Sequence, residues 1–394
     1  MRPNLSVRQK EKRPNVQRLA SKRLQLRTSR EPPMPHCAGC FLGKRPNMFA
    51  AAQYSETVAL LKTRLAGLFP LSWYRTLCES PTAAAFLKQL QDAGIPLAPD
   101  GRLPTKQWLL THWLVPDYRS VMLRIPRAAQ PVIRAWIDRL ELENVKYAVR
   151  SLASGESIRL EALIDLGPLA TIPKAAFRDL THMADLEAVA QHTTFETPLR
   201  ATAHRLPEEH GGFIIEAALD RAVYSSLNRT VHRYRGLGAV SLRRLTSQFM
   251  TMMVLLWVIR YRLSYGLPAE TVLGLAATSS LGKVVDIVHR ATAVATHEDL
   301  QSLWTDVAGE AASRQSGQSR ATSEQTLLAW EHLLWHKVHQ AASASLLGPP
   351  FGVSVLVGLL LLKELAIRDI AVICQGRAQS LASDALRPLL IHQY

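Results

Sequence analysis

The stretch PPFGVSVLVGLLLLKELAIRDIAVICQG, residues 349–376, decides the fold class. Two prolines stand at its start, and proline suits the first turn of a helix but not the interior. Residues 353–362 are almost all apolar, and Ile367, Ile370 and Ile373 continue an apolar stripe among charged residues. This pattern predicts a long helix buried in protein. The run is too short to cross a bilayer, which requires about 20 apolar residues.

The composition of the whole chain favours the same fold class. The 394 residues are 47% hydrophobic but only 7% aromatic, and Leu and Ala are abundant. Such a balance favours helices over sheets, and the length allows two or three domains. We therefore expect an all-α protein.

The basic charge is concentrated at the N-terminus. Residues 1–47 carry 12 Lys or Arg and 2 Glu, out of a net charge of +15 for the chain. Because large apolar residues are scarce there, we predict a disordered basic tail over 1–47. The tail is interpreted either as an extension without a specific role, which we favour, or as an arm that binds nucleic acid or anionic lipid.

The cysteines do not form a disulfide framework. Cys78 and Cys374 lie in apolar helical surroundings and are expected to be core residues, which suits a reducing, intracellular compartment. His36, Cys37 and Cys40 form an H-C-x-x-C motif. A structural zinc site requires four ligands, and no second pair follows nearby, so we do not predict a metal here.

Helical periodicity recurs along the chain at 54–69, 81–92, 108–122 and 132–155. A longer pattern is superimposed: an apolar helix with an arginine is followed by a glycine near 150–155, near 260–266 and again near 368–376. We interpret this as domain triplication. The expected domains are 48–160, 161–270 and 271–394, with approximate boundaries.

Four segments carry candidate functional residues, and the last is the C-terminal stretch quoted above. Residues 142–150 read LENVKYAVR, residues 180–199 read LTHMADLEAVAQHTTFETPL, and residues 215–227 read IEAALDRAVYSSL. Helical spacing puts Glu216, Asp220 and Tyr224 on one face, and likewise Glu364 and Arg368. From spacing alone, these are an amphipathic surface face and a surface ion pair.

Taken together and in order, these segments resemble the C-subunit family of V/A-type (vacuolar/archaeal-type) ATPases, whose eukaryotic equivalent is the d subunit of the V-ATPase. The resemblance covers roughly residues 50–394. It gives structural or interface roles to a set of motif positions, with Gly376 expected in the turn that ends the C-terminal helix: Thr194, Phe195, Glu216, Leu219, Asp220, Tyr224, Lys363, Glu364, Arg368, Asp369 and Gly376. The sequence departs from the family at MMVLLWVIR (252–260), at the Ser/Gln/Gly-rich segment 305–325 and in the basic tail.

The resemblance implies three helical domains with a pseudo-threefold repeat, arranged as a funnel. It further implies a non-catalytic central-stalk component, peripheral on the cytoplasmic face of the cell membrane. Its partners would be the proteolipid ring and the shaft subunits, and it would need no cofactor. The alternative is a helical nucleic-acid-associated scaffold that uses the basic arm. Because most of the excess charge lies in the tail and not on the folded body, we favour the first interpretation.

The sequence lacks the signatures of the usual catalytic sites. The segment 274–284 has neither the glycine spacing nor the Ser/Thr after lysine that a phosphate loop requires. His332, His336 and His339 share one helix face and are the other metal candidate. Glu331 precedes the first histidine and does not follow it, so the zinc-protease motif does not fit. We expect a half-buried polar face there.

Overall fold

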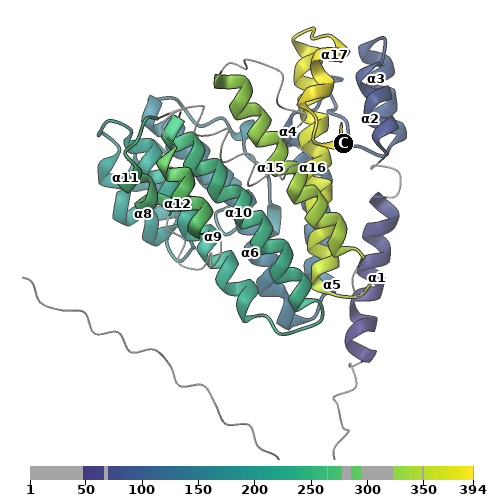
Figure 1. Ribbon diagram of the computed structural model, residues 1–394, viewed down its shortest axis with the longest axis horizontal. Helices are drawn as coiled ribbons and strands as arrows, with labels where there is room; N and C mark the ends of the chain where they lie inside the picture. Colours follow the sequence, from purple (N-terminus) through teal and green to yellow (C-terminus); the bar gives the residue numbers. More distant parts are fainter. Residues whose placement is uncertain are drawn as a thin grey trace, which may run out of the picture. The chain divides into compact units, whose positions relative to one another are not determined.

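Long helices make up most of the computed structural model, which describes residues 48–65, 70–263, 265–276, 285–294, 323–347 and 350–393 (Figure 1). Every regular element in these ranges is helical, which confirms the all-α prediction. The long helices are α1 (Met48–Leu65), α6 (Gln130–Ser154), α9 (Gly211–Arg233), α10 (Ala239–Leu263), α15 (Ser323–Ser345) and α16 (Val353–Ala378). The predicted tail, its H-C-x-x-C motif and most of 305–325 lie outside the described residues.

Shorter helices connect the long ones. They are α2 (Leu71–Cys78), α3 (Ala83–Asp92), α4 (Lys106–Leu109), α5 (Val115–Arg124), α7 (Met183–Val189), α8 (Glu196–Thr202), α11 (Ala269–Ala276), α12 (Val285–Ala293) and α17 (Ser383–Leu386). A π-helical turn (Leu110–Leu114) joins α4 to α5. Sequence periodicity predicted most of the helical residues between α1 and α6, but it did not predict α2.

Local signals fix several helix ends. The side chains of Thr82 and Thr105 accept hydrogen bonds from backbone N–H groups of the first turns of α3 and α4, as N-caps do. Gly155 ends α6 in the left-handed conformation, at φ 70°. The prediction for Gly376 is wrong, because α16 continues past it to Ala378. A Cβ at Gly376 would lie 2.0 Å from a methyl group of Leu386, so the glycine instead lets α17 pack closely.

Helix α16 is the centre of the packing. It lies between α1 and α15 (Figure 1) and also contacts α4, α5, α10 and α17. Ile367, Ile370 and Ile373 are fully buried, which confirms the predicted stripe, and Cys374 lies in the same core. The other main contacts join α6 to α9 and α10 to α15. The described residues all belong to one compact unit, and the division into three domains stays a prediction.

A membrane span was not expected from the sequence. Across the described ranges, no helix has both the length and the apolar character that crossing a bilayer requires.

Candidate functional site

A cavity of about 400 Å³ opens among the long helices α6, α9, α10, α15 and α16. We call it the charged cavity, because charged side chains from all five helices and from α4 line it, with more basic than acidic groups. They are Lys106, Arg139, Glu143, Lys146, Arg150, Glu216, Arg260, Glu331, Glu364 and Arg368. Several of these charges pair with one another across helices.

On the α6–α9 side of the cavity, the two acidic residues of the predicted α9 face, Glu216 and Asp220, pair with basic residues of α6. Lys146 Nζ lies 3.0 and 3.1 Å from the two carboxylate oxygens of Asp220. Arg150 donates to Glu216 at 2.8 Å. Burial raises the pKa of Asp220 to about 6, although the Lys146 ammonium works against that shift. The face is therefore an inter-helix contact and not a solvated surface.

The third member of that face, Tyr224, is buried beside the charged cavity. Its ring packs edge-on against Trp257, with centroids 5.1 Å apart, and lies near Phe249. Burial raises the pKa of Tyr224, so it stays a neutral phenol at physiological pH. Tyr224 thus supports the cavity wall with aromatic packing.

Glu364 of α16 pairs across to α6. It accepts from Arg139 at 2.8 Å, and the Arg139 guanidinium also lies 4.4 Å from the Trp136 ring centroid. Arg139 is almost fully buried, which opposes its charge, but the Glu364 carboxylate and nearby tyrosines raise its pKa above the ordinary value. A buried arginine held in this way has one fixed orientation.

Glu331 of α15 holds two arginines from two other helices. Arg260 of α10 donates to it at 2.9 Å, and Arg368 of α16 donates to its other oxygen. The predicted pair between Glu364 and Arg368 is therefore wrong, because each side chain reaches a different helix. Burial would raise the pKa of Glu331, but the two guanidinium groups together lower it.

The other charged motif residues of α16 lie away from the charged cavity. Lys363 is buried and donates to Asp117 of α5 at 2.5 Å. Asp369 is fully buried and accepts from the backbone N–H groups of Ile391 and His392 at 2.9 and 3.0 Å. These two residues therefore fix α16 to α5 and to the C-terminal segment.

The remaining motif positions do not line the charged cavity. Phe195 and Leu219 are core residues, and Thr194 is half-buried in the turn before α8. Sequence reasoning missed the partners Asp117, Arg139, Lys146 and Glu331. Arg139 and Lys146 stand seven residues apart on α6, two turns of one face, and this spacing could have suggested them.

The three histidines of α15 form the half-buried polar face that the sequence predicted. His336 and His339 stack with ring centroids 6.3 Å apart, and His339 packs edge-on against His392 at 4.7 Å. In the part of the chain that the structure describes, no group of three His, Cys, Asp or Glu side chains is placed to hold a metal. The rings of this face pack against one another and against His392.

This face should make the fold sensitive to acid. Burial, together with the nearby His392 and His336, lowers the pKa of His339 to about 4. A histidine with a depressed folded pKa stabilises the fold above pH 6.5 and loses that contribution as the pH falls toward 4. We expect the melting temperature of His339→Gln to fall less over this range than that of the parent. His204→Gln, at an exposed site, should behave like the parent.

Glu331 should contribute measurably to stability. Glu331→Gln leaves Arg260 and Arg368 close together without their shared anion, and we expect a loss of about 1–3 kcal/mol in the free energy of unfolding. Glu56→Gln, which breaks the exposed pair with Arg124, should change it by less than about 0.5 kcal/mol. Urea unfolding compares the variants. Equal losses in both would contradict the linking role of Glu331.

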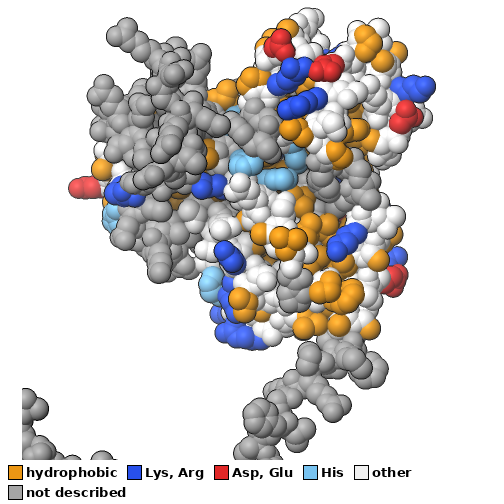
Figure 2. Space-filling view, turned by 45° about the vertical axis from the view of Figure 1, so that its right-hand side comes forward, with side chains coloured by type: hydrophobic (Ala, Val, Ile, Leu, Met, Phe, Trp, Pro, Cys, Tyr) orange, Lys and Arg blue, Asp and Glu red, His pale blue; other side chains and the backbone are white. Residues whose placement is uncertain are grey.

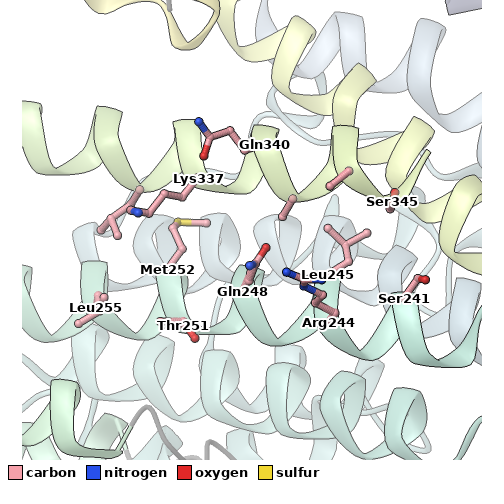
Figure 3. Close-up of a pocket in the computed structure, with 13 residues that line it drawn as sticks. Ser241, Arg244, Leu245, Gln248, Thr251, Met252, Leu255, Lys337, Gln340 and Ser345 are labelled. Carbon is pink, nitrogen blue, oxygen red and sulfur yellow. The ribbon is translucent and has the colours of Figure 1, made fainter. Parts of the chain in front are cut away.

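A second cavity, of about 420 Å³, lies between α10 and α15 (Figure 3). Leu245, Met252 and Leu255 of α10 supply apolar surface, and Arg244 and Lys337 border it with positive charge. We call it the α10–α15 groove. Among the residues that the structure describes, no acidic side chain lines it. The sequence analysis did not predict it.

Comparison with known proteins confirms the family that the sequence resembles. The model of the ATP synthase (C/AC39) subunit family matches residues 57–389, from α1 to the segment after α17. The C subunit of the A-type ATP synthase of Methanocaldococcus jannaschii is 22% identical over 357 residues, which cover 86% of this chain and 86% of the archaeal one. Because the family model matches most of the chain, including every helix that lines the charged cavity, the chain belongs to the ATP synthase (C/AC39) subunit family.

Proposed function

We propose that this protein is a non-catalytic central-stalk component of a V/A-type ion-translocating ATPase. It links the proteolipid ring of the membrane to the shaft, on the cytoplasmic face of the cell membrane. In this role it couples ATP hydrolysis or synthesis to the transport of protons or sodium ions. The observation that carries the proposal is the charged cavity, in a chain whose family is that of an ATP synthase subunit.

The ion pairs around the charged cavity suit a part that transmits torque. Arg139–Glu364 ties α6 to α16, and Glu331 ties α15 to both α10 and α16. A close-packed helical body resists shear, and links between helices far apart in sequence add to its stiffness. These contacts hold the helices in place, and the proposed role includes no chemical reaction in this protein.

Three arginines offer a docking surface for the shaft. Arg150, Arg260 and Arg368 come from α6, α10 and α16, one from each predicted domain, and all three are partly exposed at the charged cavity. This arrangement supports the proposed pseudo-threefold funnel. We infer that the end of the shaft presents acidic or polar groups to these arginines.

Deleting the protein tests the proposed coupling role. Hydrolysis needs only the catalytic head and the shaft, whereas transport needs rotation to reach the ring. We therefore expect a deletion strain to release ATPase activity from its membranes and to lose the ATP-driven ion gradient. Returning the gene should restore the gradient. An intact gradient in the deletion strain would remove the coupling role, and a defect in RNA or DNA processing would favour the nucleic-acid alternative.

A further inference from the structure

The turn between α9 and α10 is a concentrated basic surface. Residues 229–244, which we call the arginine turn, contain five arginines and no acidic residue. Arg229, Arg233 and Arg244 are exposed and have no partner among the described residues. Arg235 and Arg243 donate to the backbone carbonyl of Tyr234. Three guanidinium groups are thus free to bind an anion.

Folding does not account for all of this charge. Arg229 and Arg233 stand near the C-terminus of α9, where the helix dipole favours cations. Arg244 stands in the second turn of α10, near the N-terminal end of the helix, where the helix dipole disfavours cations. Like charges so close together also repel one another. The arrangement therefore fits an external anionic partner better than it fits a purely structural role.

Exposed apolar side chains lie beside the arginine turn. Val240 is 75% exposed, and Leu347 and Phe351, in the turn between α15 and α16, are 89% and 37% exposed. We call these three the apolar tips. The two turns touch, because Val353 N donates to Leu237 O at 3.3 Å. Both lie where α10 and α16 begin (Figure 1), and Figure 2 shows hydrophobic and basic side chains interspersed over the lower half of its face.

The α10–α15 groove opens from the same end of the molecule. Ser241 and Arg244 of the arginine turn line it, together with Ser345 at the end of α15. Figure 3 shows Ser241 and Ser345 at one end of this lining, with Arg244 and Leu245 next along α10. Positive charge from Arg244 and Lys337 lies beside apolar side chains in this lining, which is complementary to an amphiphile with an anionic head.

We propose that the arginine turn and the apolar tips bind the surface of a membrane that contains anionic phospholipid. Arg229, Arg233 and Arg244 contact the phosphate groups, and the apolar tips enter the interface between headgroups and acyl chains. A single-stranded nucleic-acid surface would present several aromatic rings for bases to stack on, whereas two of the three tips are aliphatic. The inference rests on this surface and not on the proposed rotor role.

Vesicle binding by the full chain tests the charge part of the proposal. The probes are vesicles of phosphatidylcholine alone and vesicles that also contain phosphatidylglycerol. The variant Arg229→Gln/Arg233→Gln/Arg244→Gln should bind the anionic vesicles roughly 100-fold more weakly than the parent, given the usual gain per basic residue at such a surface. The variant Arg75→Gln/Lys88→Gln/Arg178→Gln removes the same number of positive charges at exposed sites elsewhere. Its affinity for the anionic vesicles should fall far less.

That matched pair also controls for the basic tail, which all variants retain. If both triple variants lose affinity equally, net charge alone explains binding and the proposal fails. If the first variant binds anionic vesicles like the parent but loses affinity for RNA or DNA, the surface is a nucleic-acid interface and the proposal is overturned.

Insertion of the apolar tips needs a separate measurement. An environment-sensitive fluorophore is attached at Val240→Cys in a chain with Cys37→Ser and Cys40→Ser, since Cys78 and Cys374 are buried. We expect a blue shift and gain of emission with anionic vesicles. The same probe at Leu381→Cys, an exposed site on the segment before α17, should not respond. Unchanged emission at Val240 while the protein binds vesicles would overturn the insertion.

Discussion

Ile370→Asp is expected to unfold the protein under conditions where the parent chain is folded. Ile370 is fully buried in α16, between Ile367 and Ile373 on the same stripe. Losing the burial of a large aliphatic side chain costs about 2–5 kcal/mol, and burying a carboxyl group without a partner adds further cost. A total of roughly 5 kcal/mol or more is comparable with the whole stability of many proteins.

Thermal melting followed by circular dichroism measures this effect. Ile370→Val is the matched control, because it removes one methylene group and should cost about 0.5–1.5 kcal/mol. The exposed Leu381 offers a second comparison, and Leu381→Asp should melt close to the parent. If Ile370→Asp also melted like the parent, α16 could not be the centre of the core.

The helical fold was predictable because its signals are local. The apolar run at 353–362 and the isoleucine stripe at 367–373 are readable from neighbouring residues, and α16 follows them closely. Gly155 likewise marks the end of α6 by its backbone preference. Gly376 shows the limit of such reasoning. Its role is set by contact with Leu386 across a turn, and nothing in the local sequence shows that contact.

For the charged residues of α16, the sequence identified one member of each ion pair but not its partner. The motif resemblance found Lys363, Glu364 and Arg368 without their partners. Glu364 and Arg368 stand one turn apart, which suggested that they pair with each other. Their actual partners, Arg139 and Glu331, are 225 and 37 residues away in sequence, so no periodicity connects them. Only the packing of α6 and α15 around α16 brings these charges together.

Asp117→Asn is expected to cost about 3–5 kcal/mol, because it leaves a buried charge without its anion. Lys363 is 2% exposed, and its Nζ lies 2.5 Å from Asp117 and 4.5 Å from the centroid of the Trp113 ring. Arg64 also pairs with Asp117, but it is partly exposed and can be solvated by water. The main loss therefore comes from Lys363. Urea unfolding of the variant measures it, and Arg124→Gln, which breaks an exposed pair with Glu56, is the control.

The dependence of this loss on pH identifies its cause. Burial already lowers the pKa of Lys363, and Asp117 opposes that shift. Without Asp117 the pKa falls further, and a lysine with a depressed folded pKa regains stability as the pH rises from that value toward 10.5. The deficit of Asp117→Asn should therefore shrink between pH 7 and pH 10. Asp117→Leu combined with Lys363→Met should recover much of the stability at pH 7, since replacing a buried ion pair by apolar groups is often neutral. A deficit that is constant with pH and persists in the double variant would show that Asp117 acts through packing, and that the charge of Lys363 has no part in it.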